Sequence, residues 1–231
     1  MKETEDRHQT VAVSEDQDRA MQLIEWIQAR AFEGVGPLSS STDLAEEYRI
    51  DQGYADNDAR VRALIRWETT KNFTSGFVTG LGGLITLPVA VPAALGASWL
   101  ILARMVAAIA TIYGHDLRED RVRTMVLLAI VGDAVEEVLK RAGIQVGRKL
   151  TERAVQQVSG KALIEINKRI GFRLITKAGE RGVVNLMKAV PLAGGVVGGS
   201  FDAVTCRQVG RTAMKLFRPP PSRLGPSATS I

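Results

Sequence analysis

The sequence predicts an all-α fold, a multi-helix bundle around two apolar helical hairpins that glycine and proline interrupt. Apolar residues recur at helical spacing over most of the chain. No segment alternates with period two for long enough to indicate a sheet. Two long apolar segments, residues 73–113 and 183–204, contain prolines that do not fit inside one straight helix, so each segment is expected to bend.

The first third of the chain predicts a polar tail followed by three short helices. Residues 1–20 are polar and lack apolar periodicity, so we expect a disordered tail. Leu23, Ile27 and Ala31 recur at helical spacing, and Gly34 offers a stop. A capping pair of Asp43 and Glu46 would begin a second helix. A third is expected over residues 56–71.

The apolar segment that follows predicts two helical arms around a proline corner. Between residues 73 and 113 the only formal charge is Arg104. Pro88 and Pro92 separate a first arm, residues 74–87, from a second arm, residues 92–113. At a rise of ~1.5 Å per residue the first arm is roughly 21 Å long and the second roughly 33 Å, so only the second could cross a bilayer core of about 30 Å.

Helices are expected over residues 121–141, 147–159 and 161–178 in the second half of the chain. The second apolar segment follows with Pro191 near its middle, and an amphipathic helix closes the fold near Phe217. Residues 218–231 contain four prolines and predict a flexible tail. The helical domain would therefore span residues 21–217.

Charge is divided unevenly along the chain. Residues 1–72 carry a net charge of −6 and residues 73–231 a net charge of +11, with the basic excess between residues 140 and 181. Such a basic region predicts an anionic partner, and Lys168, Arg169 and Arg173 are the candidates for contact with a lipid surface. Few aromatic residues interleave with these cations, which argues against nucleic acid. A solvated helix surface is the alternative.

Glycines in the apolar segments predict close helix packing. Glycines four residues apart share a helix face and allow another backbone to approach. The candidate packing residues are Gly76, Gly80, Gly82, Gly83, Pro88, Pro92, Pro191, Gly194 and Gly198. The run at Gly80 lacks the lysine and hydroxyl of a phosphate loop, so no nucleotide site is expected there.

Arg104 is costly in an apolar environment and should face a carboxylate. Asp133 and Asp202 are the acids embedded in otherwise apolar stretches, so they are the candidate partners for a buried ion pair. A structural ion pair is the favoured interpretation, with a buried switch or site as the alternative.

The sequence predicts no catalytic, cofactor or metal site. One cysteine, Cys206, and two histidines are too few for a thiolate- and imidazole-rich metal centre. No nucleophile with a plausible base is apparent. The polar, acidic N-terminus does not resemble a signal peptide, so we expect the protein on the cytoplasmic side of a membrane or in the cytoplasm.

Three blocks of this sequence resemble the EcsC family: GFVTGLGGLITLPVAVPA at residues 76–93, IATIYGHDL at residues 109–117, and VPLAGGVVGGSFDAV with VGRTAMKLF within residues 190–217. The resemblance covers roughly residues 44–217. The family is named for a protein encoded beside an ABC transporter linked to protein secretion. The resemblance implies a fold and a cellular setting, and it identifies no catalytic residues in this chain.

Two functions from different classes follow from these observations. One is a non-enzymatic, membrane-associated accessory or adaptor protein that binds a lipid surface and is linked to a transport or secretion component. The other is a soluble helical module that binds a protein partner or a lipid and keeps the apolar hairpins in its core.

Overall fold

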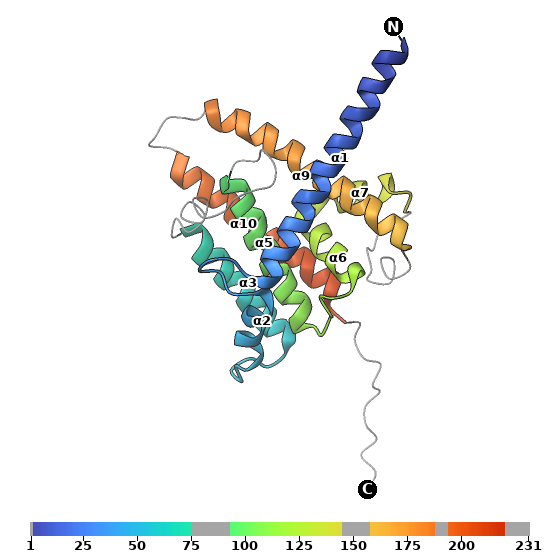
Figure 1. Cartoon of the computed structure of the whole chain (residues 1–231). Coiled ribbons are helices and arrows are strands. Elements are labelled where there is room, and N and C mark those ends of the chain that lie inside the picture. Colours follow the sequence, from blue (N-terminus) through green and yellow to red (C-terminus); the bar gives the residue numbers. More distant parts are fainter. Residues whose placement is uncertain (1, 75–92, 145–157, 188–193, 220–231) are drawn as a thin grey trace.

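A computed structural model describes residues 2–74, 93–144, 158–187 and 194–219 (Figure 1). Within these ranges helices dominate and no strand forms, so the prediction of an all-α fold is confirmed. The helices are α1 (Lys2–Glu33), α2 (Ser41–Arg49), α3 (Asn57–Thr74), α5 (Ala93–Ile112), α6 (Asp120–Val131), the 3-10 helix η1 (Gly132–Ala134), α7 (Val135–Arg141), α9 (Gly160–Met187) and α10 (Gly194–Phe217).

Helix α5 forms the centre of the bundle, with α1, α2, α3, α6 and α10 packed around it (Figure 1). Its side chains from Leu100 to Ala110 are buried on every face. A helix that is apolar all round must be covered by protein or by lipid. In this fold the other helices cover it, and 83% of the apolar window Leu95–Ile112 is buried.

Helix α1 is much longer than the sequence indicated. It begins at Lys2, so the prediction of a disordered tail over residues 1–20 is wrong for residues 2–20. The sequence there contains Glu, Gln, Arg and Ala, which favour helices, and it contains neither glycine nor proline. The C-terminal part packs on α5 and α9, and the N-terminal part projects beyond the bundle (Figure 1).

The turns around α2 follow local sequence rules. Ser40 caps α2 by accepting a hydrogen bond from the Asp43 amide, and the Asp43 side chain accepts one from the Ser40 amide. The capping pair is therefore Ser40 with Asp43, three residues earlier than the predicted Asp43 with Glu46. Gly34, the predicted stop of the first helix, has a φ of +88° that favours glycine.

The predicted helix over residues 121–141 is interrupted. Gly132 adopts a φ of +59° after Val131, where α6 ends. The chain then passes through η1 into α7, whose buried residues Val135, Val138 and Leu139 continue the core. The apolar periodicity did not reveal the break, because both helices bury their apolar residues in the same core.

Helices α9 and α10 complete the bundle. The stripe of Leu163, Ile166, Ile170 and Leu174 is buried, and α9 packs on α1 and α6. Helix α10 packs on α3, α5 and α6 and ends at Phe217, as the sequence predicted. The first arm of the first hairpin, the proline of the second, nearly all of the predicted helix at 147–159 and most of the C-terminal tail lie outside the described residues.

Candidate functional site

A cleft of about 550 Å³ lies between α1, α7 and α9. Helix α1 contributes Gln17 and Ala20 to its wall, and α7 contributes Val138. Six charged side chains also line the cleft, all of them from α7 and α9: Arg141, Lys168, Arg169, Arg173, Glu137 and Glu165. The volume is within the range of about 300–1,000 Å³ that is usual for ligand sites.

The spacing of residues along α9 places its charges in the cleft. Glu165, Arg169 and Arg173 are four residues apart, as are Lys168 and Phe172, so they form two adjacent rows on one side of the helix. The buried stripe of α9 packs into the core beside these rows. The helix therefore presents a charged surface along one edge of its apolar face.

A close crossing of α1 and α9 forms one wall of the cleft. A Cβ atom on Gly171 would lie within 2.8 Å of the Ala20 carbonyl carbon, so only glycine allows the two backbones this separation. The crossing brings Gln17 to Lys168, whose Nζ donates a hydrogen bond to Gln17 Oε1 at 3.2 Å.

Two carboxylates pair with three arginines in the cleft. Glu137 accepts both Arg141, at 2.9 Å, and Arg173, at 3.0 Å, through different oxygens. Glu165 pairs with Arg169 at 2.7 Å. These side chains are between a third and two-thirds exposed, so each pair stabilises the fold by ~1 kcal/mol at most.

Arg169 retains an unsatisfied donor. Its Nε is buried and has no hydrogen-bond partner in the described part of the chain. A buried donor without a partner costs free energy. The rest of the guanidinium lines the cleft, where its Nη2 pairs with Glu165.

The structure brings together the three predicted lipid-contact residues, Lys168, Arg169 and Arg173, and it adds acids that the sequence analysis missed. Glu165 could have been found from its four-residue spacing to Arg169 on one helix. Glu137 is 36 residues from Arg173, and a single sequence gives no indication of that contact. The predicted patch of cations is therefore a cleft of mixed charge.

Arg104 is buried, and among the described residues it pairs with Glu68. Its Nη1 lies 3.5 Å from Glu68 Oε2, and both side chains are less than a tenth exposed. Its Nε and Nη2 donate hydrogen bonds to the Ser39 carbonyl at 2.6 Å and the Ser39 hydroxyl at 2.7 Å. The side chains of Asp133 and Asp202, the predicted partners, lie outside the described residues.

Most of the predicted packing residues also lie outside the described part: Gly76, Gly80, Gly82, Gly83, Pro88, Pro92 and Pro191. Gly194 and Gly198 lie in the first two turns of α10, but what they contact is not described. On the described helices, close packing occurs at Gly171 and at Gly210, where a Cβ would meet the Ile65 side chain at 2.7 Å. Both glycines border the apolar stripe of their helix, and that position is the feature that could have identified them.

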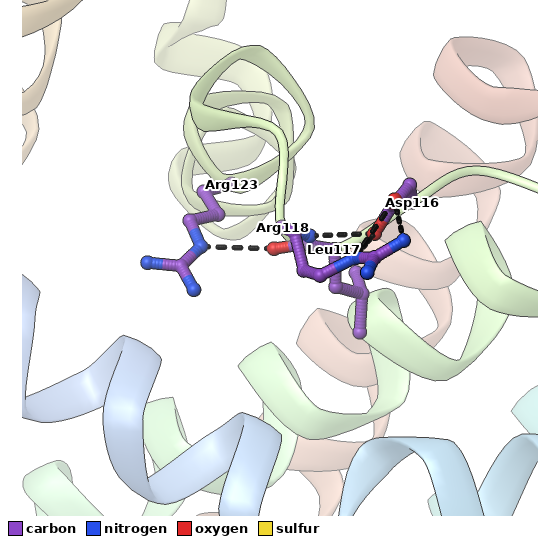
Figure 2. A network of polar contacts seen from close by, with 4 residues as sticks. All are labelled: Asp116, Leu117, Arg118 and Arg123. Carbon is purple, nitrogen blue, oxygen red and sulfur yellow. Dashed lines mark hydrogen bonds and ion pairs between the residues drawn. The ribbon is translucent and has the colours of Figure 1, made fainter.

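The loop between α5 and α6 holds a small polar network at the surface (Figure 2). The Arg118 guanidinium and amide donate to the Asp116 carboxylate, and they lower the pKa of that carboxyl to about 2. Arg123 donates to the Leu117 carbonyl at 2.8 Å (Figure 2). Arg123 belongs to α6, and its guanidinium also lies 5.6 Å from the centre of the Phe32 ring on α1, so the network holds the turn against these helices.

The side chains of Tyr113 and Cys206 contact neighbouring helices. The Tyr113 hydroxyl donates to Asp58 at 2.7 Å, and desolvation together with that hydrogen bond raises the pKa of the phenol. Asp58 also pairs with Arg218, which fastens the end of α10 to the start of α3. Cys206 is buried with its Sγ 3.7 Å from Met105 Sδ. No cluster of metal-ligating side chains occurs among the described residues.

The comparisons with known proteins give one result. The family model described as the EcsC protein family matches residues 14–219, which is most of the chain and includes every residue of the cleft. No curated protein and no solved structure matches the chain. The match also includes the three sequence blocks that resemble the family, so the resemblance is confirmed. The chain belongs to the EcsC protein family.

Proposed function

We propose that this EcsC-family protein is a non-enzymatic binding domain that attaches peripherally to the cytoplasmic face of an anionic membrane. The observation that carries the proposal is the cleft between α7 and α9, where four cations and two carboxylates line the cavity among the described residues. Phe172 is 53% exposed beside those cations. A cationic surface with an exposed aromatic ring is suited to the region of lipid headgroups.

The burial of α5 supports a peripheral mode of attachment. In the described part of the chain α5 is the one helix long and apolar enough to cross a bilayer, and five other helices cover it. Inserting it would expose the apolar faces of those helices to water, at ~25 cal/mol per Å² of apolar surface. Attachment through the charged surface avoids that cost.

A soluble partner-binding module is the second candidate, and the same burial of α5 favours it. The described helices enclose a continuous apolar core. In either case we propose no reaction. The family's namesake is encoded beside an ABC transporter, which suggests a transport or secretion component as the protein partner.

Sedimentation of the full chain with vesicles separates the two candidates. We expect binding to vesicles that contain phosphatidylglycerol, none to purely zwitterionic vesicles, and release at high salt because exposed charges are screened within about 3 Å at 1 M. Absence of binding to the anionic vesicles overturns the membrane proposal and leaves the soluble module. Retention through both high salt and alkaline carbonate contradicts peripheral attachment.

A variant with Lys168→Gln, Arg169→Gln and Arg173→Gln tests the role of the cleft. Each cation near an anionic surface contributes about 1 kcal/mol, so the triple variant should bind roughly tenfold to hundredfold more weakly. The matched control removes the same charges from exposed positions outside the cleft: Arg49→Gln, Lys161→Gln and Arg211→Gln. An equal loss in the control would show that the attraction does not depend on α9's cleft.

A further inference from the structure

The described lining of the cleft carries more positive than negative charge. Among these residues the four cations Arg141, Lys168, Arg169 and Arg173 outnumber the two acids Glu137 and Glu165, a net charge of +2. Glu137 is shared by two arginines, so it can neutralise only one of them. A phosphomonoester carries a charge of about −1.5 to −2 at pH 7, close to this excess, whereas a phosphodiester carries about −1.

The cleft also retains hydrogen-bond donors beyond those used by its own acids. A guanidinium has five N–H donors in a planar fork, and an ammonium has three. In the described part of the chain Arg173 donates to Glu137 and Lys168 donates to Gln17, so each keeps further N–H donors. Phosphate oxygens are acceptors that this arrangement of guanidinium groups can bind from several sides.

Phe172 and Val138 add an apolar component to the same cavity. Val138 is buried, whereas the Phe172 ring is exposed at the lining. A ligand that joins a phosphate to an apolar portion would contact both the cations and the ring. Inorganic phosphate alone would use only the cations.

We infer that the cleft between α1, α7 and α9 is a specific site for a phosphomonoester group, with Lys168, Arg169 and Arg173 as the residues that bind it. This inference rests on the proposed function, and it identifies phosphatidate-type headgroups as the lipid ligand. It distinguishes a discrete site from general attraction between a basic surface and an anionic membrane. Glu137 competes with the ligand for Arg173.

The experiment compares binding of the full chain to vesicles that contain phosphatidate with binding to vesicles that contain phosphatidylglycerol at matched surface charge. The ratio of the two affinities is the readout. We expect the wild-type chain to favour phosphatidate by roughly tenfold, since two or more charge-assisted hydrogen bonds distinguish the headgroups. Lys168→Gln with Arg173→Gln should reduce the ratio to about one.

The control variant, Lys161→Gln with Arg211→Gln, removes the same charges outside the cleft and should leave the ratio unchanged. A loss of preference could also come from misfolding of the variant, so a variant that is expected to gain preference is tested as well. Glu137→Gln raises the net charge of the cleft and removes the competing carboxylate, so it should increase the preference for phosphatidate. The matched control is Glu46→Gln on α2, which also removes the acid of an exposed ion pair with arginine.

A ratio of about one for the wild-type chain overturns the inference while leaving peripheral membrane binding intact. A control variant that loses the preference as fully as the cleft variant overturns it too. The source of the phosphate is tested with glycerol 3-phosphate and inorganic phosphate, followed by NMR shifts of α9 amides. If these soluble anions bind the cleft and no vesicle does, the phosphate site stands and the membrane proposal fails.

Discussion

Gly171 sets the distance between α1 and α9, and therefore the position of one wall of the cleft. A side chain there would meet backbone atoms of Ala20, which belong to a helix and cannot rotate away. Gly171 faces backbone, whereas Gly210, the other close-packed glycine on the described helices, faces the side chain of Ile65. A mutation at Gly171 thus forces the helices apart.

Gly171→Ala is expected to lower the free energy of unfolding by ~1–3 kcal/mol, the usual cost of overpacking, although alanine favours helices by ~1 kcal/mol over glycine. Urea denaturation measures the change. Gly160→Ala serves as the control, because nothing lies within 4 Å of a Cβ at that position. Equal stability of the two variants would contradict the close crossing.

The Asp116 carboxylate in the loop before α6 makes a prediction about pH. Its lowered pKa means that its pairing with Arg118 favours the folded state above the unfolded pKa near 3.8, and that this contribution is lost as the pH falls through about 2. An NMR titration of the side-chain carboxyl should give a midpoint of about 2. Arg118→Gln should move the midpoint upward, and an unchanged midpoint would exclude Arg118 as the cause.

At the level of the helices, the ion pair of Arg104 and Glu68 joins three elements. Arg104 lies on α5, Glu68 on α3, and Ser39 directly before the cap of α2. The pair is buried, so its two charges depend on each other and on the Ser39 groups. It fixes the position of α2 and α3 against the central helix.

Arg104→Met should destabilise the fold by ~3–5 kcal/mol, because it leaves the Glu68 carboxylate buried without its guanidinium. The double variant Arg104→Met with Glu68→Met should lose less than the sum of the two single variants, because two methionines leave no buried charge. Urea denaturation of the three variants gives the coupling energy. Additive losses would mean that the two side chains do not interact.

The helices show where sequence reasoning works. Apolar periodicity predicted α3, α5, α9 and the end of α10 because each buries a continuous stripe or surface. It missed the break at Gly132, since a positive φ is a local backbone property. It also missed residues 2–20 of α1, whose helix formers show no apolar stripe.

The candidate site was only half predictable. Basic residues on α9 were evident in the sequence, and the four-residue spacing of Arg169 and Arg173 was there to be used. The neutralising acid on α7 and the wall from α1 depend on tertiary contacts between segments far apart in the sequence. Arg104 illustrates the same limit, because Glu68 is no more conspicuous in the sequence than Asp58, the other acid of α3.

For the whole molecule, the main question from the sequence was whether the apolar segments enter a bilayer or form a core. For α5 the fold favours the core, with the charged cleft of α9 at the surface. The central claim is therefore that the protein attaches to a membrane without unpacking its central helix.

Cys206 tests that claim directly, because it is the single cysteine of the chain and is buried in α10 against Met105 of α5. The measurement is the rate at which a maleimide labels Cys206 in protein bound to anionic vesicles, compared with free protein and with protein unfolded in urea. The account predicts that the bound protein stays as protected as the free one. Labelling of bound protein at the rate of the unfolded chain would show that α5 leaves the bundle at the membrane, and would contradict the account.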